Sequence, residues 1–129
     1  MERKRETITG QIIAKANHYK IVPDAHEGKR LILDDAYKHY AQNFYKQCVI
    51  YRDRQINRPF RLYADVYQRS MAYDLDNSLK SLLDLLQDVR AITDDNRCVG
   101  IVANKHIDRQ NPRVTFEIEE IEPTIFSLK

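Results

Sequence analysis

Acidic residues gather at two points in the second half of the chain. Asp74 and Asp76 flank a single leucine, and Asp94 and Asp95 are adjacent. Carboxylates this close repel one another unless something compensates their charge. Hard divalent ions such as Mg²⁺ take oxygen ligands and are often held by one or two carboxylates together with a substrate phosphate. The spacing therefore suits a metal site that acts on phosphate.

A lysine follows the first pair of acids. If a helix begins at Asp76, Lys80 lies one turn into that helix. From there its ammonium group can reach a phosphate oxygen and offset charge that develops during reaction. Nothing in the sequence resembles a Ser-His-Asp or Cys-His arrangement, so hydroxide is the expected attacking group.

Each acid also has an ordinary structural explanation. Aspartate is a favoured N-cap, so Asp76 is expected to cap the helix that follows it, and Lys80 has the spacing for a surface ion pair with it. Asp94 and Asp95 fit a turn before a strand. A cap needs only one aspartate, however, and Asp74 comes just after a strand, where open α/β sheets bind ligands. Residue types and spacing leave both explanations open.

Composition places the chain among small globular proteins. With 129 residues, we expect one domain over residues 1–129, large enough for a hydrophobic core. The formal net charge is only +2, so any basic footprint must be local. Cys48 and Cys98 form no CxxC pair and are expected to be reduced, buried thiols. We see no signal peptide and no run of membrane-spanning length, and expect a cytoplasmic protein.

Residue periodicity predicts strands over 7–14, 60–68, 97–105 and 113–121, and helices over 33–48 and from 76 to about 92. Asp34 or Asp35 would cap the first helix. Residues 15–30 are expected to be mostly loop, with a short extended piece around 18–22, and residues 105–112 to join the last two strands as a hairpin. The order indicates the α/β (α+β) class, a single domain with a mixed β-sheet and two main helices.

A basic, proline-bearing connection, "RDRQINRPFR", precedes the strand over 60–68. Its arginines are candidates for phosphate contacts, and a solvated loop explains them equally well. The candidate DNA-binding residues are Arg52, Arg54, Arg58, Arg61 and, after the strand, Arg69.

The stretches "DLDNSLKSLLDLL", "DDNRCVGIVANK" and "PRVTFEIEE" together resemble the RusA family of Holliday junction resolvases. The family pattern is D-x-D-N-x-x-K, an aspartate four residues on, a D-D pair, a strand with a lysine at its end, and a final strand. The match covers residues 73 to 120. Its positions are Asp74, Asp76, Asn77, Lys80, Asp84, Asp94, Asp95 and Lys105.

The resemblance implies a homodimeric endonuclease that cuts four-way DNA junctions in recombination and repair, with Mg²⁺, or alternatively Mn²⁺, as cofactor. The family's essential acids, which hold the metal, would be Asp74, Asp76 and Asp95, and its essential lysine Lys80. The chain departs from the family pattern in keeping only Arg69 of an arginine run before the first aspartate. It also lacks a glycine before the D-D pair.

The sequence also fits two alternative functions, and it does not show how Asp74 and Asp95 could share a metal. A branched-DNA binding protein without cleavage, or a metal-dependent nuclease that prefers flaps, would fit parts of the pattern. A helix from Asp76 to about Ile92 would be about 24 Å long at about 1.5 Å per residue, which separates Asp74 from Asp95. Either the helix stops early and "VRAITDD" folds back, or a two-fold partner supplies Asp95.

Overall fold

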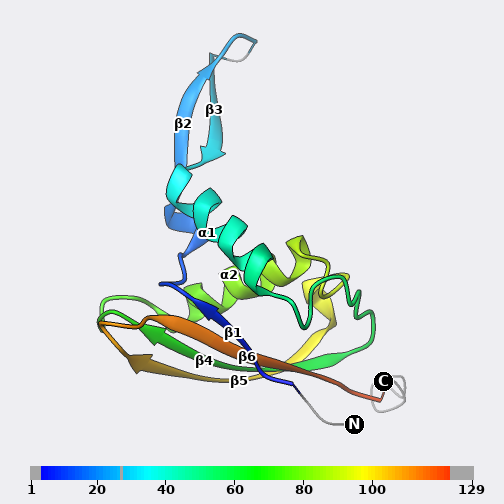
Figure 1. Cartoon of the computed structure of the whole chain (residues 1–129). Helices are drawn as coiled ribbons and strands as arrows, with labels where there is room; N and C mark the ends of the chain where they lie inside the picture. Colours follow the sequence, from blue (N-terminus) through cyan, green and yellow to red (C-terminus); the bar gives the residue numbers. More distant parts are fainter. Residues whose placement is uncertain (1–3, 27, 123–129) are drawn as a thin grey trace.

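The computed structural model describes residues 4–26 and 28–122. In this part of the chain, four strands form a mixed sheet, two α-helices cover one of its faces, and a two-stranded hairpin projects away from the sheet (Figure 1). The predicted fold class is confirmed. The elements are β1 (Glu6–Thr9), η1 (Lys15–Asn17), β2 (Tyr19–Asp24), β3 (Gly28–Leu33), α1 (Asp35–Gln47), β4 (Phe60–Gln68), α2 (Leu75–Asp88), η2 (Asp95–Arg97), β5 (Cys98–Ile107) and β6 (Arg113–Glu120).

The strand order in the sheet is β1-β6-β4-β5, which makes β4 central. β4 pairs in parallel with β5 and antiparallel with β6, and β6 pairs antiparallel with β1. The predicted hairpin of the last two strands is therefore wrong, because β4 lies between them. Helix α2 carries the chain back along the sheet, so β5 runs parallel to β4 and β6 takes the other side of β4.

The core lies between the helices and the sheet. Alternate residues of β4, from Phe60 to Val66, are buried, as the sequence predicts. The buried leucines of α2 (Leu82, Leu85 and Leu86) pack against this face. Helix α1 packs there too, and its Phe44 ring stacks on Phe116 of β6 at a centroid distance of 6.1 Å. Burial of this apolar surface is the main stabilising contribution to the fold.

Several predicted boundaries shift for local reasons. β1 ends at Thr9 because Gly10 takes φ +101° and its N–H donates to the carbonyl of Pro112. Asp34 caps α1, as predicted, by accepting the backbone N–H of Tyr37 at 2.9 Å. The loop expected over 15–30 is wrong in part, since β2 and β3 pair there, although Pro23 occupies a strand position.

Helix α2 begins one residue earlier and ends sooner than predicted. It starts at Leu75, so the N-cap position belongs to Asp74 and not to Asp76. It ends at Asp88 because Arg90 adopts a left-handed φ of 59°, after which Ala91 N–H bonds back to Leu86. Within the described residues, no helix has both the length and the apolar character needed to cross a membrane.

Candidate functional site

The first acid pair, Asp74 and Asp76, lies at the start of α2, just after the loop that follows β4. Asp74 occupies the N-cap position, but its carboxylate bonds none of the helix N–H groups. It accepts instead from the side-chain amide of Asn77, at 3.3 Å. Asp76 lies in the first turn, where its carboxylate accepts the N–H of Asn77 at 2.9 Å. Both aspartates are exposed, so their carboxylates stay accessible to a ligand.

A short chain of polar groups fixes the start of α2 against the end of β4. Gln68 is fully buried and its side-chain N–H₂ donates to Ser78 Oγ at 2.7 Å. Ser78 Oγ in turn donates to the carbonyl of Asp74 at 3.1 Å. Because buried polar groups are costly when unbonded, these contacts hold the junction in one geometry. Asp74 is thereby fixed in position.

Lys105, from β5, supports the loop that leads into Asp74. Its ammonium group donates to the carbonyls of Met71 at 3.0 Å and Tyr73 at 2.5 Å. A three-donor ammonium group satisfies carbonyls that the irregular loop leaves without ladder partners. The family resemblance implies a supporting role for Lys105. In this structure, Lys105 holds the loop before Asp74 in place.

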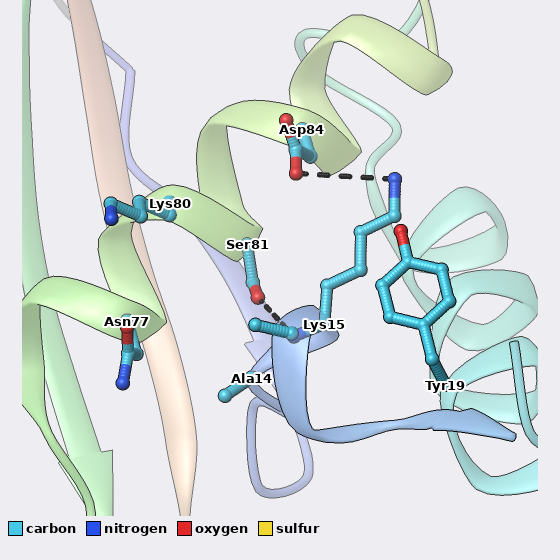
Figure 2. Close-up of a pocket in the computed structure, with 8 residues that line it drawn as sticks. Ala14, Lys15, Tyr19, Asn77, Lys80, Ser81 and Asp84 are labelled. Carbon is cyan, nitrogen blue, oxygen red and sulfur yellow. Dashed lines mark hydrogen bonds and ion pairs between the residues drawn. The ribbon is translucent and has the colours of Figure 1, made fainter.

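A groove of about 170 Å³ lies between η1 and α2 (Figure 2). The backbone N–H of Lys15 donates to Ser81 Oγ at 2.9 Å, and the Lys15 ammonium lies 3.9 Å from Asp84. The groove therefore brings two cations, an aromatic ring and polar groups together beside the first acid pair. Its lining consists of Ala14, Lys15, Ala16, Tyr19, Asn77, Lys80, Ser81 and Asp84.

Lys80 is exposed on α2 and lines this groove. Among the described residues, no carboxylate comes within 4.0 Å of its ammonium group, so the alternative of an ion pair with Asp76 does not appear here. Asp84, by contrast, forms an ion pair with Lys15. The charge of Lys80 is therefore available for an anionic ligand.

The second acid pair divides into one structural and one available carboxylate. Asp94 caps η2 by accepting the N–H of Asn96 at 3.0 Å, and this bond holds the pKa of Asp94 below its ordinary value. A hydrogen bond with Asp94 raises the pKa of Asp95, and slight desolvation and the Asp94 charge raise it further. Asp95 is exposed, and its carboxyl group is the better candidate of the two for a metal ligand.

The two acid pairs lie at opposite ends of α2. The backbone N–H of Asp95 donates to the side chain of Gln87 at 3.2 Å, in the last turn of the helix. Gln87 is thirteen positions after Asp74, which corresponds to about 20 Å along the helix axis. The segment after α2 does fold back, but it returns only as far as this last turn. Among the described residues, no three acidic, histidine or cysteine side chains gather closely enough to hold a metal ion.

The donors at the first pair nevertheless suit Mg²⁺. Two exposed carboxylates stand beside an amide, and Mg²⁺ is commonly held by one or two carboxylates plus a substrate phosphate. Asp95, the third predicted ligand, lies at the other end of α2.

The candidate arginines differ in what they contact. Arg52 lies on the Tyr45 ring, 4.6 Å from its centroid, and Arg54 lies over Tyr51. Arg61 pairs with Glu119 on the sheet face opposite the helices. Arg58 and Arg69 are exposed, and Arg69 directly follows Gln68 at the junction that positions Asp74.

Sequence reasoning missed the residues that position the site. Gln68 could have been found from the sequence. It is a polar residue at a position where the alternation of β4 predicts a buried side chain. Ser78 gave none, since serine is unremarkable on a helix. Lys15 and Tyr19 are more than fifty residues from Lys80 in sequence and join it only through the fold.

Exposed carboxylates beside a lysine, at the junction of a strand and a helix, form a site suited to chemistry on phosphate esters. A family model described as the endodeoxyribonuclease RusA matches residues 9–119. This match spans most of the chain, and the chain belongs to the RusA family. The protein is therefore a nuclease of the hydrolase class, and the resemblance in its sequence is confirmed. No curated protein matches the chain.

We expect Gln68→Leu to lower the cleavage rate about tenfold while DNA affinity stays within about twofold. Leucine keeps the buried volume but removes the donor to Ser78, so Asp74 loses part of its support, and a tenfold change corresponds to about 1.4 kcal/mol. Single-turnover cleavage and gel shifts measure the two effects. Gln42→Leu, on the exposed face of α1, is the matched control. An unchanged rate in a folded Gln68→Leu protein would contradict the positioning role.

Proposed function

We propose that this protein cuts four-way DNA junctions by hydrolysing phosphodiester bonds with Mg²⁺ as cofactor, in DNA recombination and repair. The observation that carries the proposal is the grouping of Asp74, Asp76 and Lys80 at one strand–helix junction in a chain of the RusA family. Mn²⁺, which accepts the same oxygen ligands, is the alternative metal.

Asp74 and Asp76 would hold the metal, which lowers the pKa of bound water and polarises the scissile phosphate when present. Asn77 orients Asp74 through its side-chain amide. Lys80 binds a non-bridging phosphate oxygen and stabilises the charge that grows on it. The N-terminus of α2 adds backbone N–H groups and a favourable dipole for the phosphate. Lys15 and Tyr19 line the groove in which a neighbouring nucleotide lies.

The third acid comes from a second subunit. Asp95 stands at the far end of α2 from Asp74, about 20 Å away along the helix axis, and cannot complete the site of its own chain without a rearrangement of the sheet. In a two-fold dimer with antiparallel α2 helices, the partner's Asp95 lies beside Asp74, and symmetry creates two equivalent sites. Two sites suit a junction that must be cut on two strands.

We expect cleavage of a synthetic four-way junction in Mg²⁺, and little cleavage of matched flap, nicked and linear DNAs. Asp76→Asn should abolish the cleavage but keep or strengthen junction binding, because it removes a metal ligand and a charge that repels phosphate. Labelled DNAs with and without Mg²⁺, combined with gel shifts, measure both. Binding without cutting by the wild type would identify a DNA-binding protein, and preferred flap cleavage would identify a different nuclease.

Lys80→Ala should lower the cleavage rate by at least about a hundredfold with little loss of affinity. A positioned cation contributes most where charge develops in the transition state, whereas a surface ion pair contributes under about 1 kcal/mol. Lys38→Ala, an exposed lysine on α1, provides the control. If Lys80→Ala remained within a few-fold of wild type, the catalytic role would be wrong.

Mixing two inactive variants tests the shared site. We expect an Asp74→Asn subunit and an Asp95→Asn subunit, refolded together, to regain nicking, because one site of the heterodimer then carries both wild-type acids and the other carries both lesions. Differently tagged subunits allow the heterodimer to be purified before the assay. If each site were built within one chain, every site would keep one lesion, and the heterodimer would be as inactive as its parents.

A further inference from the structure

The β2–β3 hairpin projects away from the body of the protein and carries an apolar face (Figure 1). Ile21 pairs with Leu31 across the two strands, so both side chains lie on the same face, and each is 65% exposed. Toward the body, this face continues with Tyr19, which pairs with Leu33 and is 47% exposed. Among the described residues, the ribbon has only two strands, and such a hairpin is marginally stable unless its apolar face packs against something.

The opposite face of the hairpin is basic. Neighbouring residues of a strand alternate between faces, which places Lys20 and Arg30 opposite the apolar pair. Lys29 stands nearer the tip, and all three cations are exposed. Arg30 approaches Asp24 only to 3.9 Å, and its side chain is 61% exposed. An apolar face backed by accessible cations suits DNA, which offers base surfaces for the one and phosphates for the other.

The base of the hairpin is anchored beside the groove. His18 Nδ1 lies 2.7 Å from Asp34 Oδ2, and the backbone N–H of Asp34 donates to the carbonyl of His18 at 2.7 Å. Asp34 also caps α1, so these contacts tie the hairpin to that helix. Tyr19, the first residue of β2, lines the groove that Lys80 also lines (Figure 2). The two strands of six residues therefore start at the groove and reach about 20 Å from this anchor.

We propose that the hairpin is a wedge that enters the base stack at the branch point of four-way DNA, with Ile21 and Leu31 against the unstacked bases. Proteins that unstack DNA insert leucine, isoleucine and other apolar side chains between base steps. Base pairs at a branch point are already unstacked on one side, so a wedge opens them at a lower cost than it opens a continuous duplex.

The wedge would give the protein a means of selecting branched DNA over linear DNA. The cations on the other face of the hairpin bind the phosphates of the adjoining arm. This inference rests on the proposed function for its substrate, whereas the apolar face and its anchor do not depend on it.

A fluorescent base at the branch point tests the wedge without any cleavage. The base analogue 2-aminopurine brightens when it leaves the stack, and we expect saturating wild type, without divalent metal, to raise its emission at least about twofold at the branch point and little within an arm. An Ile21→Thr, Leu31→Thr variant should lose most of this rise. Threonine keeps the strand preference of the hairpin but presents a hydroxyl to the bases. Gel shifts should show affinity within about tenfold of wild type, because phosphate contacts dominate it.

Three further variants separate the apolar contact from other effects. An Ile21→Leu, Leu31→Ile variant keeps the face apolar and should keep the rise. Val49→Thr changes an apolar side chain that is 67% exposed on the body of the protein, and it should behave as wild type. A Lys20→Gln, Arg30→Gln variant should lower the slope of log affinity against log salt by about 2 while the rise at saturation stays.

Cleavage of a junction that is already open separates the wedge from the proposed chemistry. In Mg²⁺, the threonine variant should cut a fully paired junction about tenfold more slowly than wild type, and a junction with mismatched pairs at its branch point within about twofold of wild type.

A wild type that left the central base stacked, or that did not bind the junction, would overturn the wedge. So would a threonine variant that unstacked the base as well as wild type, or that cut both junctions with the same defect or with none. A wild type that unstacked the base but cut no junction would support the wedge and reject the proposed function. A wild type that cut the junction without unstacking it would do the reverse, so the two failures are distinguishable.

Discussion

Parallel pairing of β4 with β5 is the constraint on which the rest of the structure depends. A parallel neighbour can begin only after the chain has returned to the starting end of the sheet, and α2 makes that return. The residues before α2 thus lie at one end of the sheet and those after it at the other. The separation of Asp74 from Asp95 follows directly from this connection.

The same connection explains two of the buried polar residues, Gln68 and Ser78. The end of β4 and the start of α2 meet without a regular ladder, and Gln68 and Ser78 supply the missing bonds inside the core. Lys105 serves the exposed loop in the same way. The exposed carboxylate of Asp74 makes few contacts of its own, so the groups behind it fix its position.

The charge on α2 is predominantly negative. The helix and its cap carry four aspartates and a single lysine, Lys80. Lys15 from η1 offsets part of this charge. Burial is the main cause that raises the pKa of Asp88, the nearby Asp84 adds to the rise, and Lys15 opposes it. Among the described residues, neither Asp74 nor Asp76 forms an ion pair with a lysine or arginine.

The sequence by itself determined the local features. The period of two over residues 60–68, the period of 3.6 in both helices and the cap at Asp34 were all predictable, because each depends on neighbours within a few residues. The order of acids and lysine also identified the family. The tertiary structure alone decided that β4 separates β5 from β6, that β2 pairs with β3, that Lys15 and Lys80 line the same groove, and that Asp95 lies far from Asp74. Strand partners and the ends of a connection are fixed by contacts between distant segments, and local periodicity carries no information about which distant segment will be met.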